Sequence, residues 1–489
     1  MTQARIDKMM RPKAMTNKKM SFAAVLTVAG IVYALISMVN HYLFKTYGLD
    51  LGLYTHAMHD FLHLRIDDCS MFKETSQSIL AAHFDLYLLI LSPLACLFGS
   101  CTLLIVQIAA VLLGGWGIYK LIGLYTDDDL MPILASAVFF MSFGIIHAMS
   151  YDYHSNVLTA MMLPWLLYFI KKRQMGLATL MVVLFVIGKE NLSLWLFFIA
   201  IGLMWDYRKD KKVLWHLLVY AIFGLAYFLI INMVVMPKIG GEGISRYNHL
   251  GSNYAEIALQ LVTHPGETLR ILFTNTNAHP NVNPRKAEFY FCALASGMLL
   301  TVLKPNYLFM LIPLIVQKMF SIDPMLWGVS VHYNVEFVPV LVISSFLVIL
   351  KLKKQLPRLV LASALLLSTV LTTFYTIGEP NSMVLLDQIS VFQGRHYQQR
   401  KFDAKFARQL IRQIPDEASV SAATMFVPHL AMRNDIYDLD NRPNPGADYV
   451  LITEPYFDKV KYWKRVFPDK EDYETVATDG TLYLLRRKP

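Results

Sequence analysis

The feature that most constrains this chain is a long series of apolar runs. Several approach or exceed 18 residues, the length at which a helix can cross the hydrocarbon core of a bilayer. The hydrophobic share of 55% and the mean hydropathy of +0.42 are too high for an ordinary soluble protein of 489 residues. The sequence therefore predicts a polytopic α-helical membrane protein. Its twelve apolar runs lie at roughly 21–44, 84–99, 101–124, 130–149, 155–170, 175–188, 191–205, 213–236, 287–303, 305–320, 334–350 and 359–377.

Four clusters of Lys and Arg predict which of these runs cross the membrane. They lie in the first 20 residues and at 171–173, 208–212 and 351–358, and such clusters collect in cytoplasmic loops. All four reach one side only if one run before 171 does not cross. The run at 84–99 is the best candidate, because its length of about 16 residues is typical of an interfacial or re-entrant segment. We therefore expect eleven transmembrane helices, since twelve would place three basic clusters outside.

This scheme divides the chain into three parts. A basic cytoplasmic N-terminus at 1–20 precedes a transmembrane domain at 21–377, which carries exterior loops at 45–100 and 237–286. The character then changes. "KFDAKFARQLIRQIP" predicts an amphipathic helix, "ASVSAATM" and "ADYVLIT" predict strands, and "YETVATDGTLYLLRR" predicts a hairpin around Asp479-Gly480. We expect residues 378–489 to form a small exterior α/β domain.

Charge and cysteine content exclude several classes of protein. The net charge of +9 is explained by cytoplasmic loops, so we predict no nucleic-acid partner. The four cysteines form no CxxC pair, which argues against a disulfide framework and a zinc site. The first apolar run ends in "VNHYLFKTYG" without a small-residue cleavage site, so it is expected to be an uncleaved first span.

Ionisable side chains collect on the face that this scheme predicts as exterior. Each one alone is readily explained as a solvated helix end or a polar position on a surface helix. Lys189-Glu190 differs, because it lies between two apolar runs, where a charged group costs about 2.5–3.5 kcal/mol and usually faces a cavity or a partner. We interpret the set as a candidate site. Its members include Asp50, His56, His59, Asp60, His83, Asp85, Asp152, His154, Lys189, Glu190, His332, Tyr333 and Glu336.

Five short segments resemble one family of prokaryotic membrane proteins. They are "YGLDLGLYTHAMHDF", "HFDLYLLILSPLACLFG", "SYDYHSNVLTAMMLPW", "GKEN" and "HYNVEFVPVL". Their order and spacing resemble the domain-of-unknown-function 2079 family, over about residues 45–345 and, with a C-terminal pattern, most of the chain. That family is similar to the GT-C superfamily of membrane glycosyltransferases, which includes the protein O-mannosyltransferases and the lipid A aminoarabinose transferase.

The resemblance implies a GT-C-like fold and a transferase that moves a sugar from a polyprenyl-phosphate carrier to an acceptor on the exterior face. By position, Asp50 corresponds to the first-loop carboxylate that acts as base or is linked to a metal, and Asp152 to a further acidic position. Lys189 is the candidate for the carrier phosphate. A divalent metal, Mg²⁺ or Mn²⁺, at Asp50, Asp152 and His154 is left open, because Leu51 stands where many relatives have a second acidic residue. The remaining candidates for substrate contact are Glu190, His83, His332, Tyr333 and His154.

The residue types present are compatible with the chemistry that the resemblance implies. An inverting glycosyl transfer needs one carboxylate base, and a cation to stabilise the leaving phosphate. We expect the protein in the prokaryotic plasma (inner) membrane, with its N-terminus cytoplasmic and its C-terminal domain exterior. The main alternative is a transporter or flippase for a lipid-linked or anionic solute, which would show deeper charges and an internal repeat. A scaffold whose exterior domain binds a partner is a further alternative.

Overall fold

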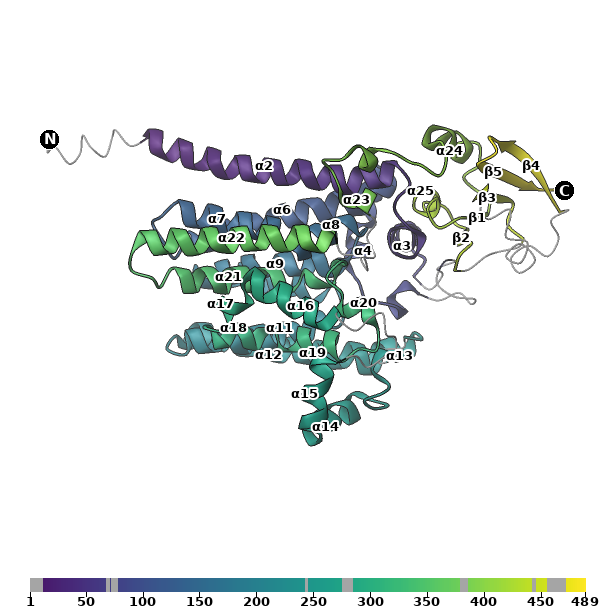
Figure 1. The fold of residues 1–489 in the computed structure, drawn as a ribbon. Coiled ribbons are helices and arrows are strands. Elements are labelled where there is room, and N and C mark those ends of the chain that lie inside the picture. Colours follow the sequence, from purple (N-terminus) through teal and green to yellow (C-terminus); the bar gives the residue numbers. More distant parts are fainter. Residues whose placement is uncertain are drawn as a thin grey trace.

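A computed structural model gives the fold of the protein. It describes residues 12–66, 71, 78–241, 245–274, 285–378, 386–441, 446–454 and 472–489, and from residue 21 onward their side chains as well. Helices form most of the molecule, and a small sheet lies at its C-terminal end (Figure 1).

The long helices lie side by side in a bundle, because their surfaces are apolar nearly all round (Figure 1). They are α2 (Pro12–Tyr42), α6 (Thr102–Ile122), α7 (Leu130–Met141), α8 (Phe143–Ser150), α9 (Ser155–Lys171), α10 (Met175–Val186), α11 (Leu192–Tyr207), α12 (Lys211–Ile230), α21 (Phe337–Ile349) and α22 (Gln355–Ile377). Shorter helices join them: α3 (Leu53–Leu62), α4 (Tyr87–Leu91), α5 (Ala95–Phe98), α13 (Met236–Lys238), α14 (Tyr254–Thr263), α15 (Pro265–Phe273), α16 (Arg285–Ala293), α17 (Leu299–Thr301), α18 (Pro305–Met310), α19 (Ile312–Met319), α20 (Pro324–Trp327) and α23 (Leu386–Ile389).

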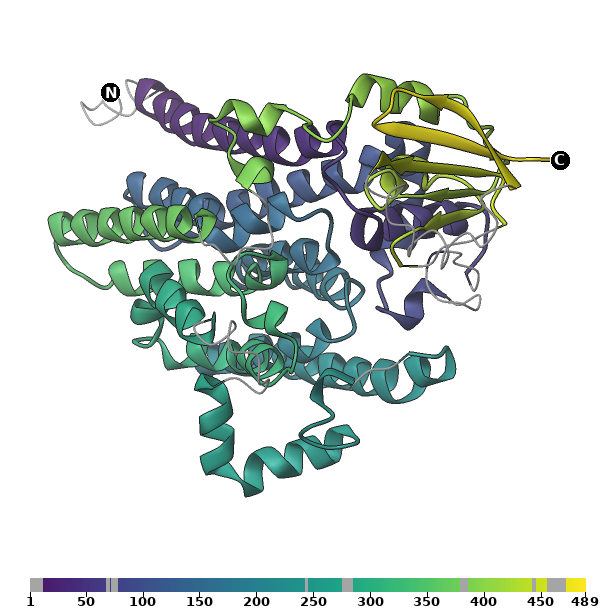
Figure 2. The same cartoon turned by 45° about the vertical axis from the view of Figure 1, so that its right-hand side comes forward.

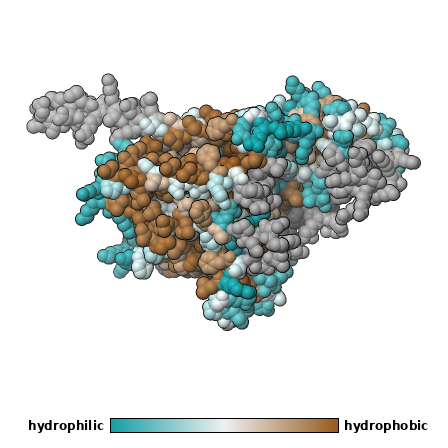
Figure 3. Space-filling view, viewed as in Figure 1, coloured by the Kyte–Doolittle hydropathy of each residue, from teal (hydrophilic) through white to brown (hydrophobic). Residues whose placement is uncertain are grey.

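The bundle has the surface of an integral membrane protein. Among the described residues, five helical segments are long and apolar enough to cross a membrane, or six if α7 and α8, bent by 46°, form one span. Large aliphatic and aromatic side chains on α12 and α22 are exposed. Figure 3 shows the result as a hydrophobic belt over the bundle, with hydrophilic residues at the helix ends. Such a belt is stable only against lipid.

The segment before α6 does not continue that helix smoothly. α4 and α5 are separated by a turn that contains Pro93, and Gly99 follows with φ of 53°. Leu97 and Phe98 are exposed. Proline and a left-handed residue both interrupt a helix, so residues 87–101 form short turns rather than the start of one straight span. Whether this segment lies at the membrane interface, as the sequence predicts, stays a prediction.

The C-terminal sheet confirms the strands and the hairpin expected from the sequence. Its order is β2-β1-β3-β5-β4, with β1, β2 and β3 parallel and β5 antiparallel to both β3 and β4. Gly480, with φ of 87°, makes the turn between β4 and β5. The amphipathic helix is α24 (Ala404–Ile411). The strands are β1 (Val420–Ala422), β2 (Ile436–Asp438), β3 (Tyr449–Thr453), β4 (Tyr473–Thr478) and β5 (Leu482–Arg487), and α25 (Val427–Leu430) follows β1.

The sheet is seated on the loop that follows α2, which Figure 2 shows beside α3. The backbone N–H of Gly48 donates to Thr424 Oγ1 over 2.9 Å. His56 Nδ1 lies 3.2 Å from the carbonyl oxygen of Ala431, and His59 Nε2 lies 3.1 Å from Asn434 Oδ1. Two of the histidines that the sequence places near the candidate site therefore join the C-terminal sheet to the first loop.

Candidate active site

Asp50 lies on a π-helical turn, Gly48–Gly52, which leads from α2 into α3. Its Oδ1 atom lies 3.2 Å from Nε2 of His154, a residue 104 positions away in the sequence. The Asp50 side chain keeps 26% of its surface exposed, whereas that of His154 keeps 6%. The carboxylate is therefore oriented by a buried imidazole and still reaches solvent, as a general base requires.

The turn between α8 and α9 carries His154 and so determines where the contact between Asp50 and His154 forms. Asp152 adopts the left-handed conformation, with φ of 48°, which a non-glycine residue takes only when its surroundings enforce it. Gln107 of α6 supplies that constraint, because its Nε2 donates to the Asp152 carbonyl over 2.7 Å and its Oε1 accepts from the His154 N–H over 2.9 Å. The position of His154 is thus fixed by a polar side chain inside an otherwise apolar helix.

The Asp152 carboxyl group points back to the first loop. Its Oδ2 accepts a hydrogen bond of 3.0 Å from the backbone N–H of Tyr47. Burial, and then the nearby Asp50 carboxylate, raise the pKa of Asp152 well above its usual range. Asp152 therefore links the turn to the loop that carries Asp50. Its direct participation in catalysis stays a prediction.

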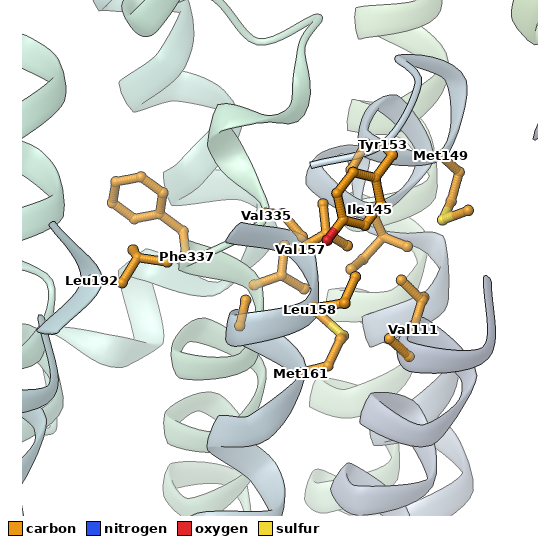
Figure 4. Packing of buried hydrophobic residues seen from close by; sticks show 14 of the residues in the cluster. Val111, Ile145, Met149, Tyr153, Val157, Leu158, Met161, Leu192, Val335 and Phe337 are labelled. Atoms are coloured by element: carbon orange, nitrogen blue, oxygen red, sulfur yellow. The ribbon is translucent and has the colours of Figure 1, made fainter. Parts of the chain in front are cut away.

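Tyr153 anchors the same turn in the apolar core. Its side chain is fully buried among residues of α8, α9 and the segment before α21. Figure 4 shows Tyr153 in this cluster together with Ile145, Met149 and Val157. Tyr153 lies between Asp152 and His154 in the chain. Its packing in the core therefore helps to hold those two side chains in a defined position.

His332 extends the imidazole cluster toward a second group of residues. Its ring stacks on that of His154, with centroids 3.3 Å apart and planes 15° apart. Tyr151 packs against both rings, at 5.7 Å from His154 and 5.4 Å from His332. Tyr333 follows His332 in the chain, and its ring centroid lies 4.0 Å from that of His332. Tyr333 also lines a cavity to which α11, α12 and α19 contribute. The group formed by Asp50, His154 and His332 is therefore adjacent to that cavity.

Glu190 and His83 meet at the edge of the cavity. Glu190 Oε1 lies 3.2 Å from His83 Nδ1, and its Oε2 accepts from the backbone N–H of Phe84 over 3.0 Å. Burial alone would raise the pKa of Glu190, but the charges of His83 and Lys189 outweigh it and lower the pKa to about 2. Glu190 therefore remains an anion that fixes the loop between α10 and α11.

Lys189 lies beside this pair and lines the same cavity. Within the part of the chain that the structure describes, no ion pair of 4 Å or less is found for its ammonium group, although Glu190 and Glu336 raise its affinity for a proton from farther away. Burial is the larger influence and lowers the pKa of Lys189. An anion placed next to Lys189 would relieve that cost.

The cavity has a volume of about 660 Å³ and a lining of mixed chemistry. Charged and polar groups come from His83, Asn156, Lys189, Glu190, Arg246, Lys318, Tyr333 and Glu336, among others. Apolar and aromatic side chains include Leu194, Trp195, Phe198, Phe228, Met236, Leu250, Ile257, Leu261, Ile312 and Val316. Such a lining suits a ligand with an anionic head and a hydrocarbon tail. Asp50, Asp152, His154 and His332 lie outside this lining.

Comparison with known proteins places the chain in a family. Residues 40–478 match the family model described as "Predicted membrane protein (DUF2079)". The chain belongs to this family. No curated protein matches the sequence of this DUF2079 protein. The resemblance to this family that the sequence analysis found is confirmed. Membership of the family identifies the protein as an integral membrane protein.

The fold of this DUF2079 protein resembles that of a solved structure, ArnT. A crystal structure of ArnT from Cupriavidus metallidurans in the apo state aligns over 96% of this chain and 98% of that chain, with a TM-score of 0.50 and 12% identity. A crystal structure of the same protein bound to undecaprenyl phosphate aligns over 95% and 97%, with a TM-score of 0.49 and 11% identity. At such identity the likeness to the apo structure shows the fold alone.

The polar lining of the cavity includes residues that the sequence analysis did not single out, among them Lys318, Asn156 and Arg246. Lys318 of α19 forms an ion pair with Glu336, and Asn156 Nδ2 donates to the other oxygen of Glu336 over 2.9 Å. Lys318 carried the same signal as Lys189, a lone charge inside an apolar run. Arg246 had no such signal, because it lies in a polar loop.

The described residues contain no group of three or more His, Cys, Asp or Glu side chains placed to hold a metal ion. The carboxylates of Asp50 and Asp152 are directed at His154 and at the Tyr47 amide. We therefore derive no step through a metal, and metal dependence stays a prediction.

Proposed function

We propose that this protein is a membrane glycosyltransferase that moves a sugar from a polyprenyl-phosphate carrier to an acceptor on the exterior face. The observation that carries the proposal is the cavity near Asp50, whose lining combines apolar and charged side chains. The apolar side chains suit a prenyl chain, and Lys189, which is also in the lining, has no ion pair among the described residues. A phosphate group is the anion that such a cation, in such a lining, would hold.

Each cluster has its own part in the proposed reaction. Asp50 accepts the proton of the acceptor hydroxyl group while the acceptor oxygen forms a bond to the anomeric carbon. The bond between that carbon and the phosphate oxygen breaks, and its electron pair leaves on the lipid phosphate. Lys189 and Arg246 offset the charge of that phosphate, and His154 orients the base. One carboxylate base and a departing phosphate give inversion at the anomeric carbon.

The roles of the two lysines follow from their partners. Lys318 is buried and paired with Glu336, so its charge is already neutralised. Arg246 lies 3.7 Å from Asp323, also contacts Tyr333, and remains half-exposed at the cavity. Lys189 and Arg246 are therefore the proposed phosphate ligands. Lys318 with Glu336 supports the floor of the cavity.

Carrier binding is tested by native mass spectrometry of the full-length protein in mild detergent. We expect the wild type to retain added undecaprenyl phosphate, and Lys189→Ala to retain at least about tenfold less. Lys172→Ala, which removes an exposed lysine outside the cavity, serves as the control. Equal retention by Lys189→Ala and the wild type would contradict the phosphate site.

The catalytic step is tested separately, with Asp50→Asn. We expect this variant to bind the carrier as the wild type does, and to lose at least about a hundredfold in transfer to added acceptors. Full activity of Asp50→Asn would exclude Asp50 as the base. Normal binding without any transfer by the wild type would instead favour the transporter alternative.

We further propose eleven crossings, with the site exterior. Three helices, α9, α11 and α21, begin beside the site and end beside Lys171, Tyr207 and Lys351, where the basic clusters lie. The chain direction is therefore the one that the charge distribution favours. In this arrangement the C-terminal sheet is exterior and is seated on the loop that carries Asp50.

A further inference from the structure

A second cavity lies at the opposite end of the bundle from the candidate active site. It has a volume of about 390 Å³. The ends of α9, α11 and α21 line it, and the first turns of the same three helices lie at the candidate site. The 17 residues of α9 and the 16 of α11 separate the two places by roughly 24–26 Å, most of the thickness of a bilayer core.

The charge of this cavity is predominantly positive. Lys171, Lys304 and Lys351 line it, together with a single carboxylate, that of Asp206. Lys304 Nζ lies 3.6 Å from Asp206 Oδ1. Within the described ranges, Lys171 and Lys351 have no carboxylate within 4 Å. These two ammonium groups therefore have no counter-ion among the residues that the structure describes.

The carboxylate of Asp206 is held away from these two lysines. Asn306 Nδ2 donates to Asp206 Oδ2 over 3.0 Å, so both oxygens of Asp206 are engaged on the α18 side. Lys171 Nζ lies 4.3 Å from the centroid of the Tyr125 ring, and both residues line the cavity. The contacts of Asp206 therefore keep its carboxylate from pairing with Lys171 or Lys351.

The walls combine hydroxyl groups with apolar side chains. Tyr125, Tyr207 and Tyr307 supply hydroxyl groups. Leu167, Ile170, Leu203, Leu347 and Leu350 supply the apolar part. Basic residues that only orient a membrane protein do so through the number of charges in its cytoplasmic loops, and they do not need to line a cavity. Here five segments of the chain converge on a hollow of a size that holds a small ligand.

We propose that this second cavity binds a phosphate ester at the membrane face opposite the active site. Basic pockets between transmembrane helices are suited to anionic lipid head groups, so one source of the phosphate is a phospholipid of the adjoining leaflet. The other is a free phosphorylated solute. The chemistry is shared, since two ammonium groups and the tyrosine hydroxyls would contact the phosphate oxygens.

The test uses the full-length protein in a neutral detergent and two probes, dihexanoylphosphatidylglycerol and glycerol 3-phosphate. Binding is measured by native mass spectrometry and by the shift in the midpoint of thermal unfolding. We expect at least about tenfold weaker binding of one or both probes by Lys171→Gln/Lys351→Gln. The control, Lys172→Gln/Lys353→Gln, removes two exposed lysines that lie next to these positions but outside the lining.

The outcomes separate the two sources. Lysine-dependent binding of the lipid alone identifies a head-group site, and lysine-dependent binding of glycerol 3-phosphate identifies a site for a free phosphate ester. Equal binding by the cavity variant, the control and the wild type would overturn the proposal. Loss of binding in Lys189→Ala would also overturn it, because the probe would then report on the exterior cavity. The single variants Lys171→Gln and Lys351→Gln serve if the double variant does not fold.

Discussion

At the scale of single residues, the buried ion pair of Lys318 and Glu336 is an energetic constraint on the fold, because its side chains keep only 2% and 4% of their surface exposed. Removing one partner leaves the other charge buried, which costs about 3–5 kcal/mol, whereas replacing both by apolar residues is often nearly neutral. We expect Lys318→Met to lower the free energy of unfolding in detergent by about that amount. Lys318→Met/Glu336→Leu should recover most of the loss. A double variant that is no more stable than the single one would contradict this account.

Glu190 predicts a dependence of stability on pH. In the unfolded chain its pKa is near 4.5, and in the folded protein it is lowered to about 2, despite burial, by His83 and Lys189. Since the folded state binds this proton less tightly, its stabilisation is complete above about pH 4.5 and is lost as the pH falls toward 2. At pH 3 the wild type should have lost roughly 2 kcal/mol that Glu190→Gln does not lose. Denaturant unfolding at pH 7 and pH 3 measures the difference, and identical pH dependence would refute it.

At the scale of elements, the joint between the first loop and the C-terminal sheet determines where Asp50 lies. A Cβ atom on Gly48 would overlap the Oδ2 atom of Asp438, a buried side chain at the end of β2. Gly48→Ala should therefore displace the loop. A shift of about 1 Å can reduce a rate by about a hundredfold. We expect a loss of this order in sugar transfer, with carrier binding retained.

Gly394→Ala is the matched control for this substitution, because a Cβ atom at Gly394 meets no other atom within 4 Å. Limited proteolysis provides a readout that is independent of activity. Trypsin should release the C-terminal sheet faster from Gly48→Ala than from the control. If transfer and cleavage are the same in both variants, the sheet does not position the loop.

The sequence anticipated those parts of the site that carry a local signal. Lys189 and Glu190 could be found because charges between apolar runs are costly. The pairing of Asp50 with His154 could not, because it joins positions 104 residues apart and depends on how α6 and α9 pack. Gln107 and Arg246 were missed for opposite reasons. One is a neutral polar residue in a span, and the other is an unremarkable charge in a loop.

At the scale of the whole molecule, the open question is whether the segment before α6 crosses the membrane. The helical stretch Tyr87–Ile122 contains 36 residues. A straight helix of that length would extend roughly 54 Å, far beyond a hydrocarbon core of about 30 Å. The 21 residues of α6 alone extend roughly 32 Å, which matches the core. If the turns at Pro93 and Gly99 end the span, residues 87–101 lie on the side where α6 begins, as the proposed eleven crossings require.

This geometry predicts which residues share a side of the membrane. In a cysteine-free variant, single cysteines introduced by Thr2→Cys, Lys172→Cys and Lys353→Cys should all be protected from a membrane-impermeant maleimide in intact cells. Gln413→Cys, on an exposed position after α24, should be labelled. If residues 87–101 formed an additional crossing, Thr2→Cys would lie opposite Lys172→Cys and Lys353→Cys. Labelling of all four after the cells are opened shows that protection reflects the side of the membrane and not burial, and so makes the eleven-crossing path directly testable.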